Sequence, residues 1–91
     1  MDRIGTKRLN HNYKELSEFD DYLYEGEMHK EFAHGYGVAT NPKTCFTITG
    51  NFRKNMASGV MILKDLVRQT EVQAFRNGYR FGRGTIYKHN R

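Results

Sequence analysis

The sequence has little cysteine, little proline and no long apolar stretch. Its single cysteine, Cys45, excludes a disulfide within the chain and suits a reducing compartment. No apolar run approaches the roughly 20 residues of a membrane-spanning helix, and the N-terminus lacks the apolar stretch of a secretory signal. Its basic residues suggest a mitochondrial presequence as an alternative, although Asp2 and the shortness of the stretch argue against one. We therefore expect an intracellular protein, cytoplasmic or cytoskeletal, with an organellar location as the alternative.

Proline is scarce but glycine is abundant, with one proline and nine glycines among 91 residues. This balance is typical of tight turns rather than of a disordered linker. Hydrophobic residues make up only 37% of the chain, so its six Phe and six Tyr must supply much of the buried apolar surface. Aromatic side chains suit strands better than helices. The composition predicts one small domain built mainly from β-strands.

Three segments of the chain align with one another at a regular spacing. They start at Tyr24, Ile48 and Glu71, which lie 24 and 23 residues apart. A period of this length indicates a repeat architecture, in which each repeat is one supersecondary unit and neighbouring units share a core. Repeat proteins commonly bind partners over an extended surface. The expected repeats are residues 24–47, 48–70 and 71–88.

Each repeat has the pattern of a β-hairpin. From Tyr22 onward, apolar residues and glycine alternate with polar residues at a period of two. The dipeptides Asn41-Pro42 and Asn77-Gly78 favour turns. Another turn is expected at residues 53–57. The expected outgoing strands are 22–28, 45–52 and 70–76, and the return strands are 35–40, 58–63 and 82–87.

The segment before the repeats has a different pattern. Residues 1–11 show no periodicity, so we expect an arm that becomes ordered when a partner holds it. Apolar residues at helical spacing and a capping Asn12 predict a short helix within residues 12–23. Such a segment would cover the open end of the first repeat, as a solenoid requires. The expected division is an arm and cap at 1–21 and a repeat domain at 22–91.

These repeats resemble the MORN motif, the membrane occupation and recognition nexus. The family pattern has aromatic residues at its first and fifth positions and glycine at the third, eighth, twelfth and fourteenth. The matching residues are Tyr24, Gly26, Gly35 and Gly37, then Gly50, Phe52 and Gly59, then Phe75, Gly78, Gly82 and Gly84. The departures are Met28 and Glu31, then Ile48, Asn55 and Met61, then Glu71 and Gln73. The resemblance covers residues 22–88 and implies an elongated, twisted antiparallel sheet of three β-hairpins behind a helical or irregular cap.

The phased glycines have a physical interpretation that does not depend on the family. Glycine weakens a strand unless a neighbour approaches closely, so we expect a large ring of each hairpin to lie over a small residue of the next strand. Asn55 can take a left-handed turn more readily than Glu31, so the first hairpin tip should turn differently. Gln73 should be tolerated where no further repeat crowds it. The expected structural glycines are Gly26, Gly35, Gly37, Gly50, Gly59, Gly78, Gly82 and Gly84.

Two groups of side chains are candidates for binding a partner. The first group holds Tyr24, Phe52 and Phe75, which we expect in the repeat core; the alternative is an aromatic groove that grips a peptide or helix. The second group is basic, because residues 48–91 hold nine basic and two acidic residues, against six and eight in residues 1–47. It could form a stripe for an anionic partner or a set of solvated strand faces. Its members are Arg76, Arg80, Arg83 and Lys88, with Arg53 and Lys54 extending the stripe.

No catalytic or metal-binding pattern is present. Nothing in the sequence supplies Cys45 with a base or an oxyanion hole. His29, Glu31 and His34 lie close together, but a structural zinc requires four ligands from spaced pairs. Neither Gly-x-Gly pair has the strand-to-helix context of a phosphate-binding loop. We therefore expect no enzyme activity, no cofactor and no metal.

The expected function is protein–protein interaction. The resemblance implies a small eukaryotic scaffold subunit that joins a partner to a cytoskeletal, axonemal or membrane-associated assembly. One alternative is binding of anionic lipids through the basic C-terminal repeats. Another is an accessory role in an organellar or ribonucleoprotein complex, although core packing explains the aromatic residues among the basic ones more simply than nucleic-acid stacking does. Open sheet edges add pairing with a second copy as a further alternative.

Overall fold

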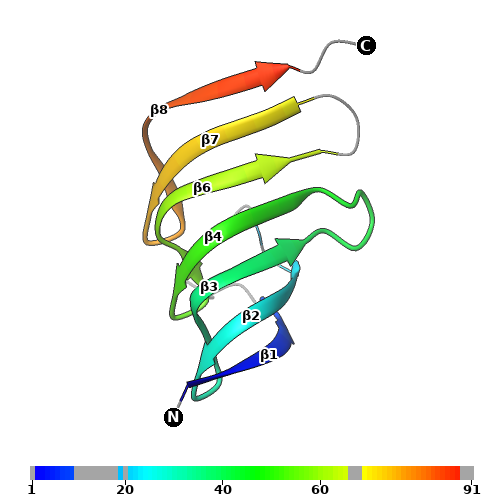
Figure 1. Ribbon diagram of the computed structural model, residues 1–91, viewed down its shortest axis with the longest axis vertical. Helices are drawn as coiled ribbons and strands as arrows, with labels where there is room; N and C mark the ends of the chain where they lie inside the picture. Colours follow the sequence, from blue (N-terminus) through cyan, green and yellow to red (C-terminus); the bar gives the residue numbers. More distant parts are fainter. Residues whose placement is uncertain (1, 10–18, 20, 66–68, 89–91) are drawn as a thin grey trace.

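The structure, a computed structural model, describes residues 2–9, 19, 21–65 and 69–88. These residues form eight strands and no helix, and the strands make one antiparallel sheet that does not close on itself (Figure 1). The order across the sheet is β1-β2-β3-β4-β6-β7-β8, and the short β5 pairs with β4. This confirms the expected all-β, twisted antiparallel sheet of hairpins. The strands are β1 (Asp2–Arg8), β2 (Leu23–His29), β3 (Phe32–Thr40), β4 (Thr47–Arg53), β5 (Met56–Ala57), β6 (Gly59–Lys64), β7 (Gln69–Arg76) and β8 (Tyr79–Lys88).

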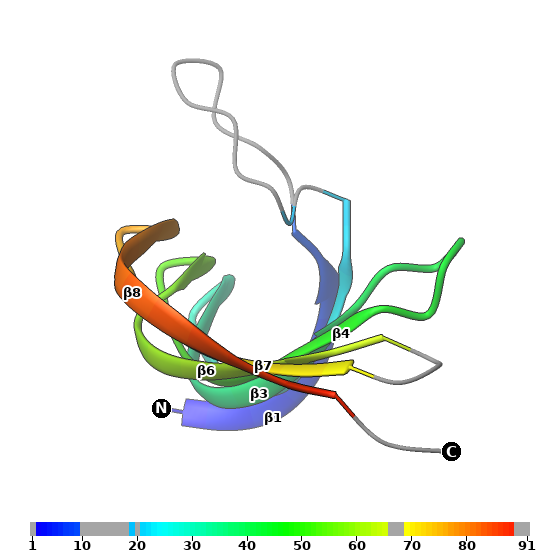
Figure 2. The ribbon, with the colours of Figure 1, turned by 90° about the horizontal axis from the view of Figure 1, so that it is seen from above.

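The sheet is a single layer that curves into a trough, as Figure 2 shows. Its extents of 43 × 24 × 23 Å make it elongated along the direction in which the strands succeed one another. Alternate residues point to opposite faces of a strand, so the period-two pattern divides the side chains between the concave and convex faces. The buried members, such as Ile48 in β4 and Met61 in β6, form a core on the concave face.

The three expected hairpins are present, with longer return strands than the sequence indicates. β3 starts at Phe32 and β8 at Tyr79, three residues before the expected starts. The reason is that each hairpin tip is a turn of only two residues, at 30–31, 54–55 and 77–78. A two-residue turn lets the strands pair immediately on either side of it.

The first tip turns differently from the other two, as the glutamate at position 31 led us to expect. In the second tip both Lys54 (φ 48°) and Asn55 (φ 72°) are left-handed. In the third both Asn77 (φ 52°) and Gly78 (φ 86°) are left-handed. In the first tip only Lys30 takes a positive φ, of 56°.

Glycines line up across the sheet where large side chains lie over them. Gly26 pairs with Gly37, which in turn pairs with Gly50. The Tyr24 ring lies so close over Gly37 that a methyl group there would overlap it. In the second and third repeats the covering side chain is not aromatic, because Met61 lies over Gly50 and Gln73 lies over Gly84.

The N-terminal segment differs from the expectation of a free arm. Strand β1 pairs with β2 along its whole length, from Asp2 opposite His29 to Arg8 opposite Leu23. The physical reason is that the backbone groups on the free edge of β2 need partners, and β1 supplies them. The division at residue 21 therefore does not separate the arm from the sheet. Most of the expected helix lies outside the described residues, which omit 10–18 and 20.

Candidate partner-binding surface

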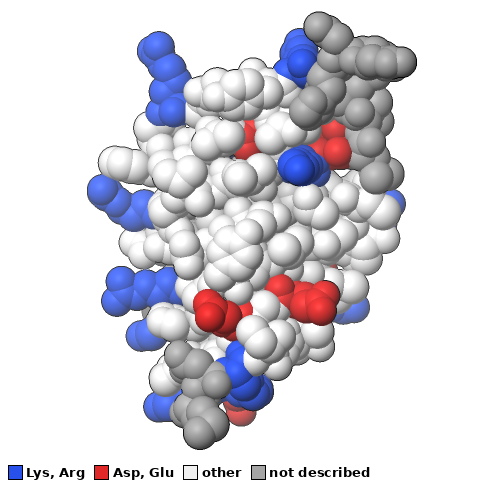
Figure 3. Space-filling view, viewed as in Figure 1, with Lys and Arg blue, Asp and Glu red and all other residues white. Residues whose placement is uncertain are grey.

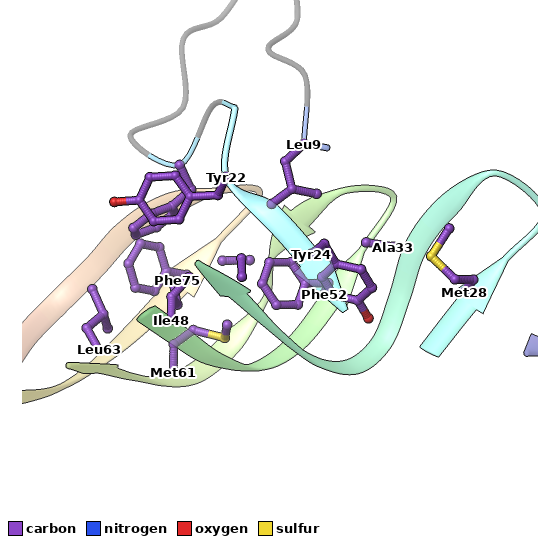
Figure 4. Packing of buried hydrophobic residues seen from close by; sticks show 13 residues of the cluster. Leu9, Tyr22, Tyr24, Met28, Ala33, Ile48, Phe52, Met61, Leu63 and Phe75 are labelled. Carbon is purple, nitrogen blue, oxygen red and sulfur yellow. The ribbon is translucent and has the colours of Figure 1, made fainter. Parts of the chain in front are cut away.

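From β2 to β7 the concave face is covered by the chain's own side chains. Tyr24, Phe52 and Phe75 are only 1%, 3% and 3% exposed, so they form core rather than an open aromatic groove. The Tyr24 and Phe52 rings meet edge to face at a centroid distance of 5.0 Å. Phe19 covers Phe75 at 5.5 Å and meets Tyr22 edge to face at 5.3 Å. Figure 4 shows these rings packed among the other buried hydrophobic residues.

Residues on both sides of the undescribed N-terminal segment help to close the trough. The Leu9 N–H donates to the Tyr22 carbonyl at 2.8 Å, and the Asp21 N–H donates to the Leu9 carbonyl at 2.5 Å. These bonds extend the β1–β2 ladder beyond the sheet and bring Leu9 and Phe19 into the core, each 3% exposed. Apolar residues of the N-terminal segment thus cover part of the third repeat, where Phe19 contacts Phe75, and not only the open end of the first repeat.

The hydroxyl of Tyr24 is also used internally. It donates to the Glu27 carbonyl at 2.6 Å. Burial, together with the nearby Glu27 carboxylate, raises the pKa of Tyr24 to about 12, because both disfavour a negative phenolate. Tyr24 is therefore a neutral, internally bonded core residue at ordinary pH.

Gln73, the departure from glycine in the third repeat, compensates for a bulge. The pairing of β7 with β8 shifts register between Val72 and Ala74. The buried Gln73 amide donates to the carbonyls of Ala74 at 3.0 Å, Phe81 at 3.0 Å and Gly82 at 3.3 Å. Because a bulge disrupts the backbone ladder, this side chain supplies bonds that the backbone lacks there.

The convex face of strands β6 to β8 carries exposed apolar side chains. Val60 lies opposite Ala74, which lies opposite Phe81, and Ile62 lies opposite Val72. Figure 3 views the convex face of the whole sheet and shows a broad uncharged area at its centre, over the middle strands. We call the large exposed members the convex surface; they are 42% to 64% exposed. They are Val60, Ile62, Tyr79, Phe81 and Tyr87.

A basic pocket adjoins this surface between the second and third hairpins. We call this cavity of about 680 Å³ the tip pocket. Arg53, Lys54 and Arg76 line it together with apolar residues, and no acidic residue lines it. The Arg76 guanidinium lies 4.0 Å from the centroid of the Phe81 ring, which belongs to both the pocket and the convex surface.

Hydrogen bonds between neighbouring hairpins hold the tips in place. The Ala33 N–H donates to Asn55 Oδ1 at 2.8 Å, and the Asn55 N–H donates to the Ala33 carbonyl at 2.9 Å. The Gly78 N–H donates to the Ala57 carbonyl at 3.1 Å. The tip pocket therefore lies between two walls that are joined to each other and to the first hairpin.

The four basic residues proposed for binding do not form one group. Arg76 lines the tip pocket. Arg80 forms an ion pair with Glu71 and lies over the Phe75 ring at 5.6 Å. Arg83 and Lys88 are exposed on the edge strand β8.

The sequence analysis did not include Val60 or Ile62 among the candidate binding residues. Their alternation with the core residues Met61 and Leu63 nevertheless placed them on the opposite face of the strand.

No metal site forms in the part of the chain that the structure describes. His29 and His34 do come together, with ring centroids 5.6 Å apart. No group of three or more metal-ligating side chains gathers around them or elsewhere among those residues.

The fold and surface define a class: an open, single-layer sheet of β-hairpin repeats with its core on the concave face and exposed apolar side chains on the convex face of β6 to β8. No protein-family model matches the chain, and no curated protein matches it. The assignment to MORN repeats therefore remains a hypothesis supported by the three aligned segments.

Proposed function

We propose that this chain is a non-enzymatic module that binds a protein partner on its convex surface. The observation that carries the proposal is the set of large apolar side chains exposed together over β6 to β8. A contiguous apolar patch on a small protein commonly marks an interaction site. Exposed Tyr and Phe beside arginine is also the composition enriched at the energetic centre of protein interfaces.

The architecture supports this choice of face. A single-layer sheet has two faces, and here the chain's own Leu9, Phe19 and Tyr22 help to cover the concave one. The convex side of β6 to β8 keeps its apolar side chains exposed. Together with the resemblance to MORN repeats, this supports a small scaffold subunit of a cytoskeletal, axonemal or membrane-associated assembly.

Capture of partners by paired variants tests the proposal. We expect the tagged chain to retain a protein from cell extract, and the double variant Val60→Ser/Phe81→Ser to lose it. The matched control is Ile4→Ser/Leu23→Ser, which replaces two exposed apolar residues at the other end of the sheet. The captured protein is then purified and its affinity for all three chains is measured directly.

Equal affinity for the three chains would show that the convex surface is not the binding site. Lipid or ribonucleoprotein binding would depend on basic residues, so Val60→Ser/Phe81→Ser would leave it largely intact. Thermal unfolding of each variant controls for loss of structure.

Among the described residues no helix is long and apolar enough to cross a membrane.

A further inference from the structure

The tip pocket concentrates positive charge that the described chain does not neutralise. Arg53, Lys54 and Arg76 line one cavity, and no ion pair with another described residue involves any of them. Like charges that line one cavity repel one another, and an anion placed between them relieves that repulsion. The pocket therefore favours a negatively charged group.

The geometry of the basic groups suits a carboxylate. A guanidinium presents a planar fork of donors that matches the two oxygens of a carboxylate. Stacking of the Arg76 guanidinium on the Phe81 ring at 4.0 Å restrains its orientation. Arg53 lies on the neighbouring hairpin, at the other wall of the cavity.

The pocket also has apolar lining residues beside its basic and polar ones. Met56, Ala57, Ala74 and Phe81 are among its lining residues. Phe81 connects the pocket to the convex surface, so a ligand that fills the pocket can continue onto that surface. A ligand with both acidic and apolar side chains satisfies both environments.

The curvature of the sheet favours a chain segment over a membrane. Figure 2 shows that the strands bend away from the convex side as they approach the hairpin tips. A flat membrane cannot follow this bend to contact the convex surface and the tip pocket together, whereas an extended peptide can.

We infer that the tip pocket binds carboxylate side chains from an acidic segment of the partner protein. The inference rests on the proposed function, because it names the chemistry of the partner that the convex surface holds. Carboxylates contact Arg53, Lys54 and Arg76, and neighbouring apolar residues of the same segment lie against Phe81.

A labelled peptide of alternating glutamate and leucine tests this, with binding followed by fluorescence anisotropy. We expect binding that weakens with added salt, and no binding of the matched glutamine–leucine peptide. The double variant Arg53→Gln/Arg76→Gln should weaken binding about tenfold, the lower range for loss of a hydrogen bond to a charged group. The control Arg8→Gln/Lys43→Gln removes the same charge away from the pocket and should change affinity less than about twofold, because distant charges are screened.

Three results would overturn the inference. The first is equal binding of the glutamine peptide, and the second is an equal loss in the Arg8→Gln/Lys43→Gln control. The third is no binding of the glutamate peptide together with binding of anionic vesicles or single-stranded DNA that depends on Arg53 and Arg76.

Failure of this inference can be told apart from failure of the proposed function. If partner capture requires Val60 and Phe81 but the glutamate peptide does not bind, the inference fails and the proposed function stands. If the peptide binds through Arg53 and Arg76 but the Val60→Ser/Phe81→Ser variant captures the partner as well as the wild-type chain does, the proposed function fails.

Discussion

At the scale of single residues, the Tyr24 ring fills the space that a side chain at Gly37 would occupy. We expect Gly37→Ala to lower the free energy of unfolding by about 1–3 kcal/mol, because the added methyl overpacks the core against this ring. In a Tyr24→Leu background the same change should cost clearly less, since the ring is absent. Urea unfolding of the four chains in this double-mutant cycle gives the coupling.

A second glycine provides the control for this cycle. Gly59 has a φ of +84° and open space around it, so Gly59→Ala should cost about 1 kcal/mol through backbone strain alone. That cost should be the same with Tyr24 or with leucine at position 24. If Gly37→Ala also costs the same in both backgrounds, overlap with the ring is not the cause.

Tyr24 also couples stability to alkaline pH. Its pKa rises from the ordinary value of 10.0 to about 12 in the folded chain. The folded state therefore holds this proton more tightly than the unfolded state, and the stability this gives is fully present below about pH 10 and lost as the pH rises towards 12. Between these values we expect the free energy of unfolding to fall more steeply in the wild-type chain than in Tyr24→Phe, which has no phenol proton.

Urea midpoints of both chains across this pH range measure the difference. Every other side chain is the same in the two chains, so its contribution cancels in the comparison. Parallel curves would show that the Tyr24 proton is held no more tightly in the folded state than in the unfolded state.

At the scale of strands and turns, local patterns predicted the hairpins and tertiary contacts determined the rest. Alternation and turn dipeptides such as Asn77-Gly78 depend on neighbouring residues only, so they were visible in the sequence. Strand β1 was not, because Ile4 is its only large apolar residue and its position depends on the free edge of β2. Likewise, whether Phe75 is core or groove depends on Phe19, which is far away in the chain.

The contact of Phe19 with Phe75 leads to a prediction about the N-terminal segment. Phe19 is 3% exposed, so Phe19→Ala should cost about 3 kcal/mol or more, the usual range for a buried ring. The same change at Phe81, which is 49% exposed, should cost less than about 1 kcal/mol. Urea unfolding of both variants provides the comparison. Equal costs would mean that Phe19 is not part of the core.

At the scale of the whole molecule, an open sheet has two free edges, and both carry positive charge. Strand β1 holds three basic residues and one acidic residue, and β8 holds three basic residues and no acidic one. Free edges tend to pair with other chains, and natural proteins place charges there to prevent it. Because both edges are positive, β8 of one copy repels β1 of another, which opposes head-to-tail association of the chain. An acidic partner meets no such repulsion.

Charge reversal on one edge tests this view of the whole molecule. We expect the wild-type chain to stay monomeric at low salt and Arg83→Glu/Lys88→Glu to associate, because an acidic β8 can then pair with the basic β1 of another copy. Added salt should weaken that association, since exposed charges are screened. The control Lys43→Glu/Lys64→Glu makes the same charge change outside both edge strands and should remain monomeric. Sedimentation velocity over a concentration series measures all three, and a monomeric Arg83→Glu/Lys88→Glu chain would show that charge is not what keeps the two edges apart.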